Sequence, residues 1–127
     1  MSYEFNNELP IYLQIIELLK KDIISKKYLP GKKIPSVREL ALDFGVNPNT
    51  VQKALAELED IGLIFTERTN GKFVTTNHNM ISQLTEQTIN KMISDFMCSL
   101  NEMGLNKKQI LEIINKELKW KFLKLKT

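Results

Sequence analysis

A pair of capped helices near the middle of this chain constrains its fold more than any other feature. Ser36 and Glu39 form a Ser-x-x-Glu pair, the capping box that begins a helix. Gly45 tolerates the left-handed conformation that ends a helix. Asn47 and Pro48 suit the N-cap and the first position of a second helix. The sequence therefore predicts two short helices joined by a tight turn, the arrangement of a helix-turn-helix.

The second of these helices has one apolar and one polar face. Apolar side chains recur with the spacing of a buried face at Val51, Ala54, Leu55 and Leu58. Polar side chains open the opposite face: Asn49, Thr50, Gln52 and Lys53. Side chains at a helix start can reach base edges in the major groove, and free backbone N–H groups there favour phosphate. The pattern favours a DNA-reading helix, although an ordinary helical hairpin with a solvated face fits it too.

Two β-favouring segments follow this helix. Residues 63–66 and 73–76 flank a polar turn that contains Asn70 and Gly71. Short apolar segments around an Asn-Gly pair predict a β-hairpin. A hairpin directly after a recognition helix is a wing. The predicted fold class is therefore mainly α with a small β-hairpin, a winged helix-turn-helix domain.

Another helix is predicted before the motif. Residues 10–28 carry an apolar stripe at helical spacing, and a Pro-Gly pair follows. The preceding arm, residues 1–9, contains Tyr3 and Phe5. The sequence leaves open whether this arm packs on its own domain or on a partner subunit.

Two amphipathic helices are predicted at the C-terminal end, after a polar hinge at residues 77–80. Apolar residues recur at helical spacing up to Gly104, and Asn106 with Gln109 forms a second capping box. Two helices alone cannot bury that much apolar surface, and exposed apolar stripes mark interfaces. We therefore expect a two-helix dimerisation hairpin that forms a homodimer through residues 80–123.

These segments divide the chain into two parts. Residues 1–76 are expected to form the winged helix-turn-helix DNA-binding domain, and residues 77–127 the helical dimerisation tail. Methionines in the tail suit either packing or an adaptable ligand pocket, and packing is favoured. Cys98 could sense oxidants, but no basic or histidine neighbour in the sequence supports a reactive thiol, so packing or simple exposure is favoured.

Composition excludes several function classes. Hydrophobic residues make up 43% of the 127, enough for a small core with an appendage. With no long apolar run and no signal-peptide pattern, we expect a cytoplasmic protein without a membrane segment. A single cysteine, Cys98, and a single histidine, His78, weaken metal binding and exclude an internal disulfide. No catalytic constellation is recognisable, so we expect no enzyme activity, no cofactor and no metal.

Net charge alone does not indicate nucleic-acid binding. The chain carries 18 Lys+Arg and 15 Asp+Glu, a net charge of +3. Residues 1–77 contain as many acidic as basic side chains, so the excess lies in the tail. Lysines do cluster in the first part of the chain: Lys20, Lys21, Lys26, Lys27, Lys32 and Lys33. They could line a phosphate path or form an ordinary solvated face, and the second is favoured for most of them.

Three runs of sequence carry a family resemblance: PIYLQIIELLKKDI, LPGKKIPSVRELALDFGVNPNTVQKALAELEDIGLI and GKFV. Through them, residues 10–74 resemble the winged helix-turn-helix domain of the GntR family of bacterial transcription regulators. The short tail is similar to that of the YtrA-type subfamily, whose members carry two C-terminal helices instead of a large effector domain.

The resemblance implies roles for particular residues. Arg38 matches an arginine at the start of the second helix that contacts DNA backbone and bases, and Gly71 matches the wing glycine. Pro48 departs from the arginine of many relatives, and the wing lacks the usual run of arginine and glycine. The candidate DNA-binding residues are Arg38, Asn47, Pro48, Asn49, Thr50, Gln52, Lys53, Gly71 and Lys72.

The expected function is sequence-specific transcription regulation. A homodimeric repressor would read a pseudo-palindromic operator in double-stranded DNA with paired recognition helices. The resemblance also implies that the regulated genes form a transporter operon. The sequence does not identify a small-molecule effector. The alternative is a winged-helix protein-interaction module without specific DNA binding, since a fold does not fix a function. The polar opening of the recognition helix, with Arg38 nearby, favours DNA.

Overall fold

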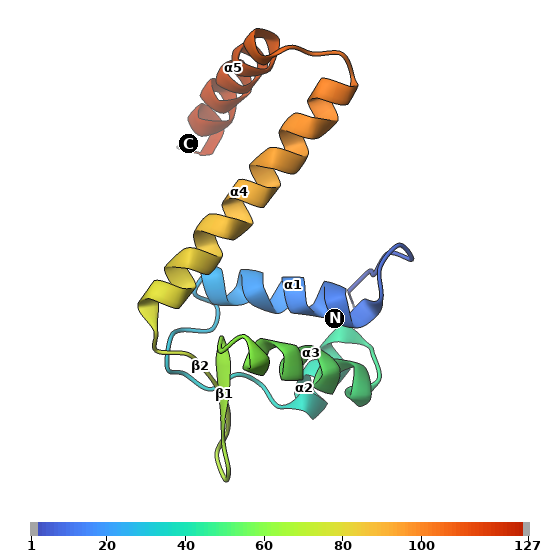
Figure 1. The fold of residues 1–127 in the computed structure, drawn as a ribbon, viewed down its shortest axis with the longest axis vertical. Coiled ribbons are helices and arrows are strands. Elements are labelled where there is room, and N and C mark those ends of the chain that lie inside the picture. Colours follow the sequence, from blue (N-terminus) through green and yellow to red (C-terminus); the bar gives the residue numbers. More distant parts are fainter. Residues whose placement is uncertain (1–2, 126–127) are drawn as a thin grey trace. The chain divides into compact units, whose positions relative to one another are not determined.

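A computed structural model describes residues 3–125, without the side chains at positions 122, 124 and 125. The described residues form five helices and one antiparallel hairpin (Figure 1). Their order is α1 (Ile11–Ile24), α2 (Val37–Phe44), α3 (Pro48–Asp60), β1 (Ile64–Glu67), β2 (Gly71–Val74), α4 (His78–Glu102) and α5 (Lys107–Leu125). The chain divides into two compact units, Met1–Thr85 and Glu86–Thr127. This architecture confirms the predicted fold class.

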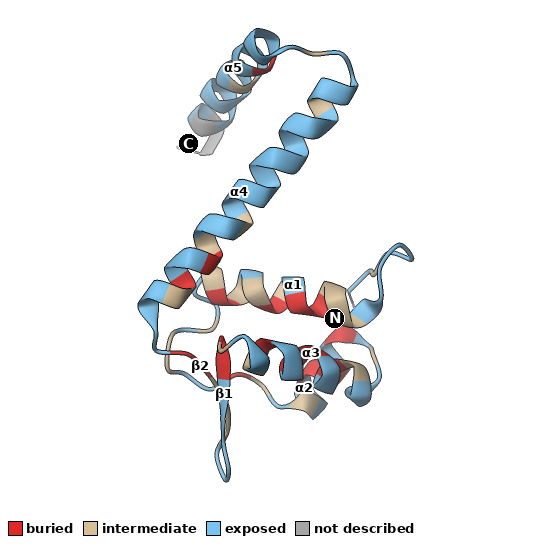
Figure 2. Ribbon diagram, in the orientation of Figure 1, coloured by how far each residue is buried: buried red, intermediate tan, exposed pale blue. Residues whose placement is uncertain are grey.

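The core of the first unit is enclosed by α1, α2, α3 and the base of the hairpin (Figure 2). The predicted apolar face of α3 is fully buried, with Val51, Ala54, Leu55 and Leu58 each at most 1% exposed. Two residues from the first turns of α4, Ile81 and Leu84, join the same core. Burial of one complete face fixes the rotation of α3, so its opposite, polar face must point to solvent.

The local signals around α2 and α3 are confirmed. The Ser36 hydroxyl accepts from the Glu39 N–H at 3.2 Å, and the Glu39 carboxylate accepts from the Ser36 N–H at 3.3 Å. Gly45 ends α2 with φ of 68°. The Asn47 side chain caps α3 by accepting from the Asn49 N–H at 2.8 Å. The helix-turn-helix is therefore specified by contacts between near neighbours in the sequence.

The hairpin differs in its limits from the predicted segments 63–66 and 73–76. β1 begins one residue later and β2 two residues earlier, because Gly71, with φ of 106°, pairs opposite Glu67 and closes the turn over residues 68–70. The other edge of β2 is also paired. The Gly31 N–H donates to the Val74 carbonyl at 2.9 Å, and the Ile34 N–H donates to the Lys72 carbonyl at 2.9 Å. The base of the wing is thus held from both sides.

The first helix is shorter than the predicted 10–28. It ends at Ile24, because Lys26 adopts a left-handed φ of 68° and the Tyr28 N–H folds back to the Asp22 carbonyl at 3.2 Å. The sequence offers no glycine at this point to signal the end.

The N-terminal arm packs on its own domain. Tyr3 and Phe5 lie against Phe44 of α2, with ring centroids 4.9 and 6.3 Å from it. The Gln14 side chain of α1 donates to the Asn6 carbonyl at 3.0 Å and accepts from the Asn6 N–H at 3.1 Å. In the single chain, the described residues of the arm therefore adopt the first of the two arrangements that the sequence left open.

The predicted hinge at 77–80 is wrong, because α4 already begins at His78. Asn77 is its cap: the side-chain oxygen accepts from the Met80 N–H at 3.2 Å. At the start of α5 the second capping box is confirmed, with Asn106 and Gln109 bonded to each other's backbone N–H groups at 2.9 Å.

The second unit leaves most of its apolar side chains exposed (Figure 2). Ile110 is buried at 3% exposure. The exposed apolar residues on the described parts of this unit are Ile89, Met92, Ile93, Phe96, Met97, Met103, Leu111, Ile113, Leu118, Trp120 and Leu123.

Candidate nucleic-acid interface

The start of α3 presents its polar side chains to solvent. The exposed residues are Asn47, Pro48, Asn49, Gln52 and Lys53, and Thr50 is half-buried. The backbone N–H groups of this turn already have acceptors within the protein. The Asn49 N–H donates to the side-chain oxygen of Asn47, and the Thr50 N–H donates to the Asn47 carbonyl at 3.0 Å. The expectation of free N–H groups for phosphate at this helix start is therefore wrong. Any polar contact that this turn makes with a ligand would therefore have to come from its side chains.

Arg38 lies in the first turn of α2 and is exposed. Within the described part of the chain, the structure records no hydrogen bond or ion pair of its guanidinium. A guanidinium held on a capped helix, without an internal partner, is available to bind phosphate or a guanine edge.

Lys53 is held in place by an aromatic ring. Its ammonium lies 4.0 Å from the ring centroid of Tyr12, which projects from α1 and is half-buried. This cation–π contact restrains the lysine beside the polar face of α3 while leaving it exposed. Helical periodicity does not predict this contact, because it joins side chains of two different helices.

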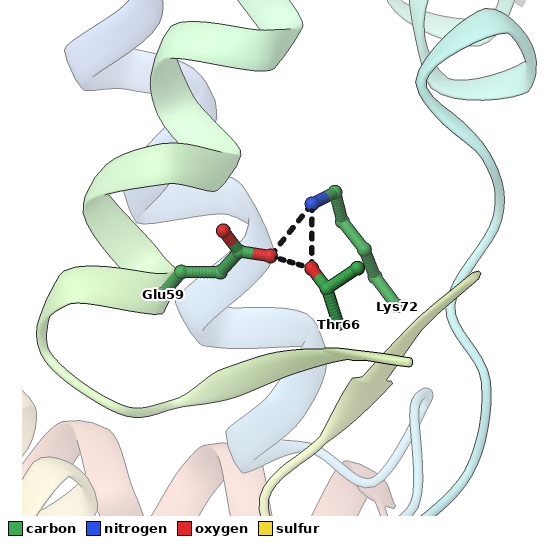
Figure 3. Close-up of polar contacts among 3 residues, drawn as sticks. All are labelled: Glu59, Thr66 and Lys72. Atoms are coloured by element: carbon green, nitrogen blue, oxygen red, sulfur yellow. Dashed lines mark hydrogen bonds and ion pairs between the residues drawn. The ribbon is translucent and has the colours of Figure 1, made fainter. Parts of the chain in front are cut away.

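The wing contains an ion-pair network that the sequence did not reveal (Figure 3). The Lys72 ammonium lies 2.6 Å from Glu59 Oε1, at the end of α3, and donates to the Thr66 hydroxyl at 2.9 Å. The Thr66 hydroxyl in turn donates to the same carboxylate oxygen. Hydrogen bonds from Lys72 and Thr66 lower the pKa of Glu59 from its ordinary value. Lys72, predicted as a wing contact to DNA, is thus engaged within the protein.

Gly71 is required by its backbone conformation. Its φ of 106° disfavours any side chain, and an added Cβ would lie 2.8 Å from Cε of Lys33. Lys33 therefore packs across the glycine, next to the exposed wing tip of residues 68–70. Two of the other clustered lysines form ion pairs, Lys20 with Glu17 at 3.6 Å and Lys27 with Asp22 at 3.8 Å.

Among residues 3–125, no group of three or more histidine, cysteine, aspartate or glutamate side chains could hold a metal ion. None of the helices in the described part of the chain combines the length and apolar character that crossing a membrane requires. Cys98 is exposed.

Comparison with known proteins identifies the family to which this chain belongs. The pattern described as "Bacterial regulatory proteins, gntR family" matches residues 11–74, from the start of α1 to the end of β2. The chain belongs to the GntR family. The family resemblance predicted from the sequence is confirmed. The relatives are transcriptional regulators, a family without enzyme activity, as expected from the sequence.

Two curated relatives come from Bacillus subtilis. The "Uncharacterized HTH-type transcriptional regulator YhcF" is 36% identical over 112 residues, which cover 88% of this chain and 93% of YhcF. The "HTH-type transcriptional repressor YtrA" is 48% identical over 68 residues, 54% of this chain and 52% of YtrA. The GntR-family chain thus matches one relative over nearly its whole length and the other over about half.

Solved structures match both the whole chain and its DNA-binding part. A "GntR family transcriptional regulator from Listeria monocytogenes" superimposes with a TM-score of 0.82 at 37% identity, over 88% of this chain and 98% of that one. The AraR DNA-binding domain "in complex with operator ORE1" superimposes with a TM-score of 0.52 at 34% identity, over 59% of this chain and 93% of that one. The described wing and α1–α3 therefore have the fold of a domain that binds operator DNA.

Proposed function

We propose that this GntR-family protein is a homodimeric repressor that reads a pseudo-palindromic operator with α3. The observation that carries the proposal is the polar opening of α3, exposed on a helix whose other face is fully buried. A rigid helix that presents Asn49 and Gln52 to solvent can place amide groups against adenine edges in the major groove. Arg38 and Lys53 add positive charge beside this surface for phosphate or base contacts.

Dimerisation is proposed through residues 80–123. On α4, Ile89, Met92, Ile93, Phe96 and Met97 recur at intervals of three and four residues, so they share one helix face. Their side chains are 39–58% exposed in the single chain. An apolar face of this kind is unfavourable in water and marks a protein interface. A second copy offers the same face, which fits the two-fold symmetry of most homodimers.

Repression and its target are inferred from relatives. YtrA is named a repressor, and AraR binds operators through a domain of this fold. A repressor of this type would act in the cytoplasm on double-stranded DNA. The transporter operon implied by the family resemblance remains a prediction.

DNA binding is tested by fluorescence anisotropy with DNA from upstream of the protein's own gene. A scrambled duplex serves as competitor, at two salt concentrations. Tight binding that resists the competitor supports a specific regulator and locates the operator. Equal, strongly salt-dependent binding to both duplexes would reject specific recognition on this DNA and favour an interaction module.

The dimer is tested separately by light scattering at micromolar concentration. Phe96→Glu places a charge in the apolar face of α4 and is expected to shift the protein toward monomer. Gln87→Glu adds the same charge at an exposed position on the other side of the helix and should leave the dimer intact. A monomeric wild-type protein, or equal behaviour of the two variants, would contradict the proposed interface.

A further inference from the structure

The wing needs an attachment beyond its own hydrogen bonds. It consists of two strands of four residues each, and an isolated two-stranded hairpin is only marginally stable in water. The backbone pairing with residues 31–34 and the burial of Ile64 and Val74 hold its base. The tip, residues 68–70, lies beyond these contacts and is exposed.

The Glu59–Thr66–Lys72 network lies between the base and the tip. Thr66 and Lys72 are partners across the two strands, and both bind the same oxygen of Glu59 (Figure 3). One carboxylate on the last turn of α3 therefore ties both strands of the wing to the recognition helix. The side chains of Lys72 and Glu59 are 25% and 30% exposed, so water only partly screens the pair.

The electrostatics of the helix end favour this arrangement. The C-terminal end of a helix carries partial negative charge, so Glu59 alone would be unfavourable there and a neighbouring cation is stabilising. Lys72 supplies that cation. A phosphate bound by Lys72 would lie close to the Glu59 carboxylate, which is 2.6 Å from the ammonium, and the two negative charges would repel each other.

We propose that Glu59 and Lys72 are positioning residues that fix the angle of the wing relative to α3. In this account Lys72 supports operator binding through the wing and not by touching phosphate. The inference rests on the proposed function for its effect on DNA binding, whereas its effect on the wing itself does not depend on that function.

The DNA test compares two glutamates of the same helix in the full-length protein. Glu59→Gln removes the negative charge from the anchor, and Glu57→Gln removes the same charge from an exposed position. Loss of a negative charge by itself should leave DNA binding unchanged or stronger. We expect Glu59→Gln to weaken operator binding about threefold to tenfold, the scale of a partly exposed charged network, while Glu57→Gln does not weaken it.

Lys72 variants separate positioning from phosphate contact. Lys72→Met should weaken binding with an unchanged slope of log K against log salt, and Lys72→Arg should restore wild-type affinity because it keeps the ion pair. A lysine that neutralises a phosphate would instead lower the slope by about 0.9 when removed. Stronger binding by Glu59→Gln, or that loss of slope for Lys72→Met, would overturn the proposal.

A second readout does not involve DNA. Hydrogen–deuterium exchange of the free protein should be faster at the amides of residues 64–74 in Glu59→Gln and unchanged in Glu57→Gln. Equal exchange in both variants would overturn the positioning role. If the wild-type protein bound no operator, the proposed function would fail, and the exchange would still decide whether the pair holds the wing.

Discussion

Truncation of Leu55 should destabilise the domain far more than truncation of Leu42. Leu55 lies in the middle of α3 and is 1% exposed, within the core shared with α1 and α2. Leu42 lies on α2 and is 76% exposed. Both changes to alanine remove the same atoms from a helix, so they differ only in the surroundings of the side chain.

The magnitude follows from burial. Each buried methylene contributes about 0.8 kcal/mol, and the cavity left behind adds to the loss, so Leu55→Ala should cost about 2–5 kcal/mol. A mostly exposed leucine buries little area, and Leu42→Ala should cost less than about 0.5 kcal/mol.

Urea unfolding followed by circular dichroism measures the difference. With an m-value of roughly 2 kcal/mol/M, Leu55→Ala should lower the midpoint by roughly 1–2.5 M. Both variants must be compared at one protein concentration, because the stability of the proposed dimer would depend on it. Equal midpoints for the two variants would refute the placement of α3 in the core, and with it the orientation of the polar face.

Three further predictions concern the interface. Arg38→Ala should weaken operator binding by about 1–3 kcal/mol, measured by anisotropy on a variant shown to be folded, and an unchanged Kd would remove Arg38 from the interface. Gly71→Ala should lower the urea midpoint because of the positive φ, and an unchanged midpoint would contradict that backbone strain. Because the folded-state pKa of Glu59 is lowered, its stabilising contribution is present above its unfolded pKa and lost as pH falls through the folded value. The stability difference between wild type and Glu59→Gln should therefore shrink on acidification; a pH-independent difference would contradict it.

The elements that the sequence predicted well are those specified by near neighbours. Ser36 with Glu39 and Asn106 with Gln109 are three residues apart, and the structure shows both capping boxes. The buried face of α3 follows from helical periodicity alone. Such interactions depend on the local backbone, so a single sequence contains the information that sets them.

The features that the sequence missed join residues far apart in the chain. Lys72 reaches Glu59 only because the hairpin folds back along α3, and Lys53 meets Tyr12 only because α1 packs beside α3. No spacing rule connects such pairs. The start of α4 was misplaced for a smaller reason, since Asn77 serves as a helix cap where polar composition had indicated a hinge.

The central claim is that the polar face of α3 recognises the base sequence of the operator. The most direct test is the DNA-binding specificity ratio of the Gln52→Ala variant. The ratio is the Kd for a scrambled duplex divided by the Kd for the operator, measured at one salt concentration for wild type and variant. We expect a wild-type ratio of about 10³ or more, and a fall of about 5- to 150-fold in the variant with its scrambled-duplex affinity unchanged. An unchanged ratio, or equal loss of affinity for both duplexes, would contradict the reading of bases by this helix.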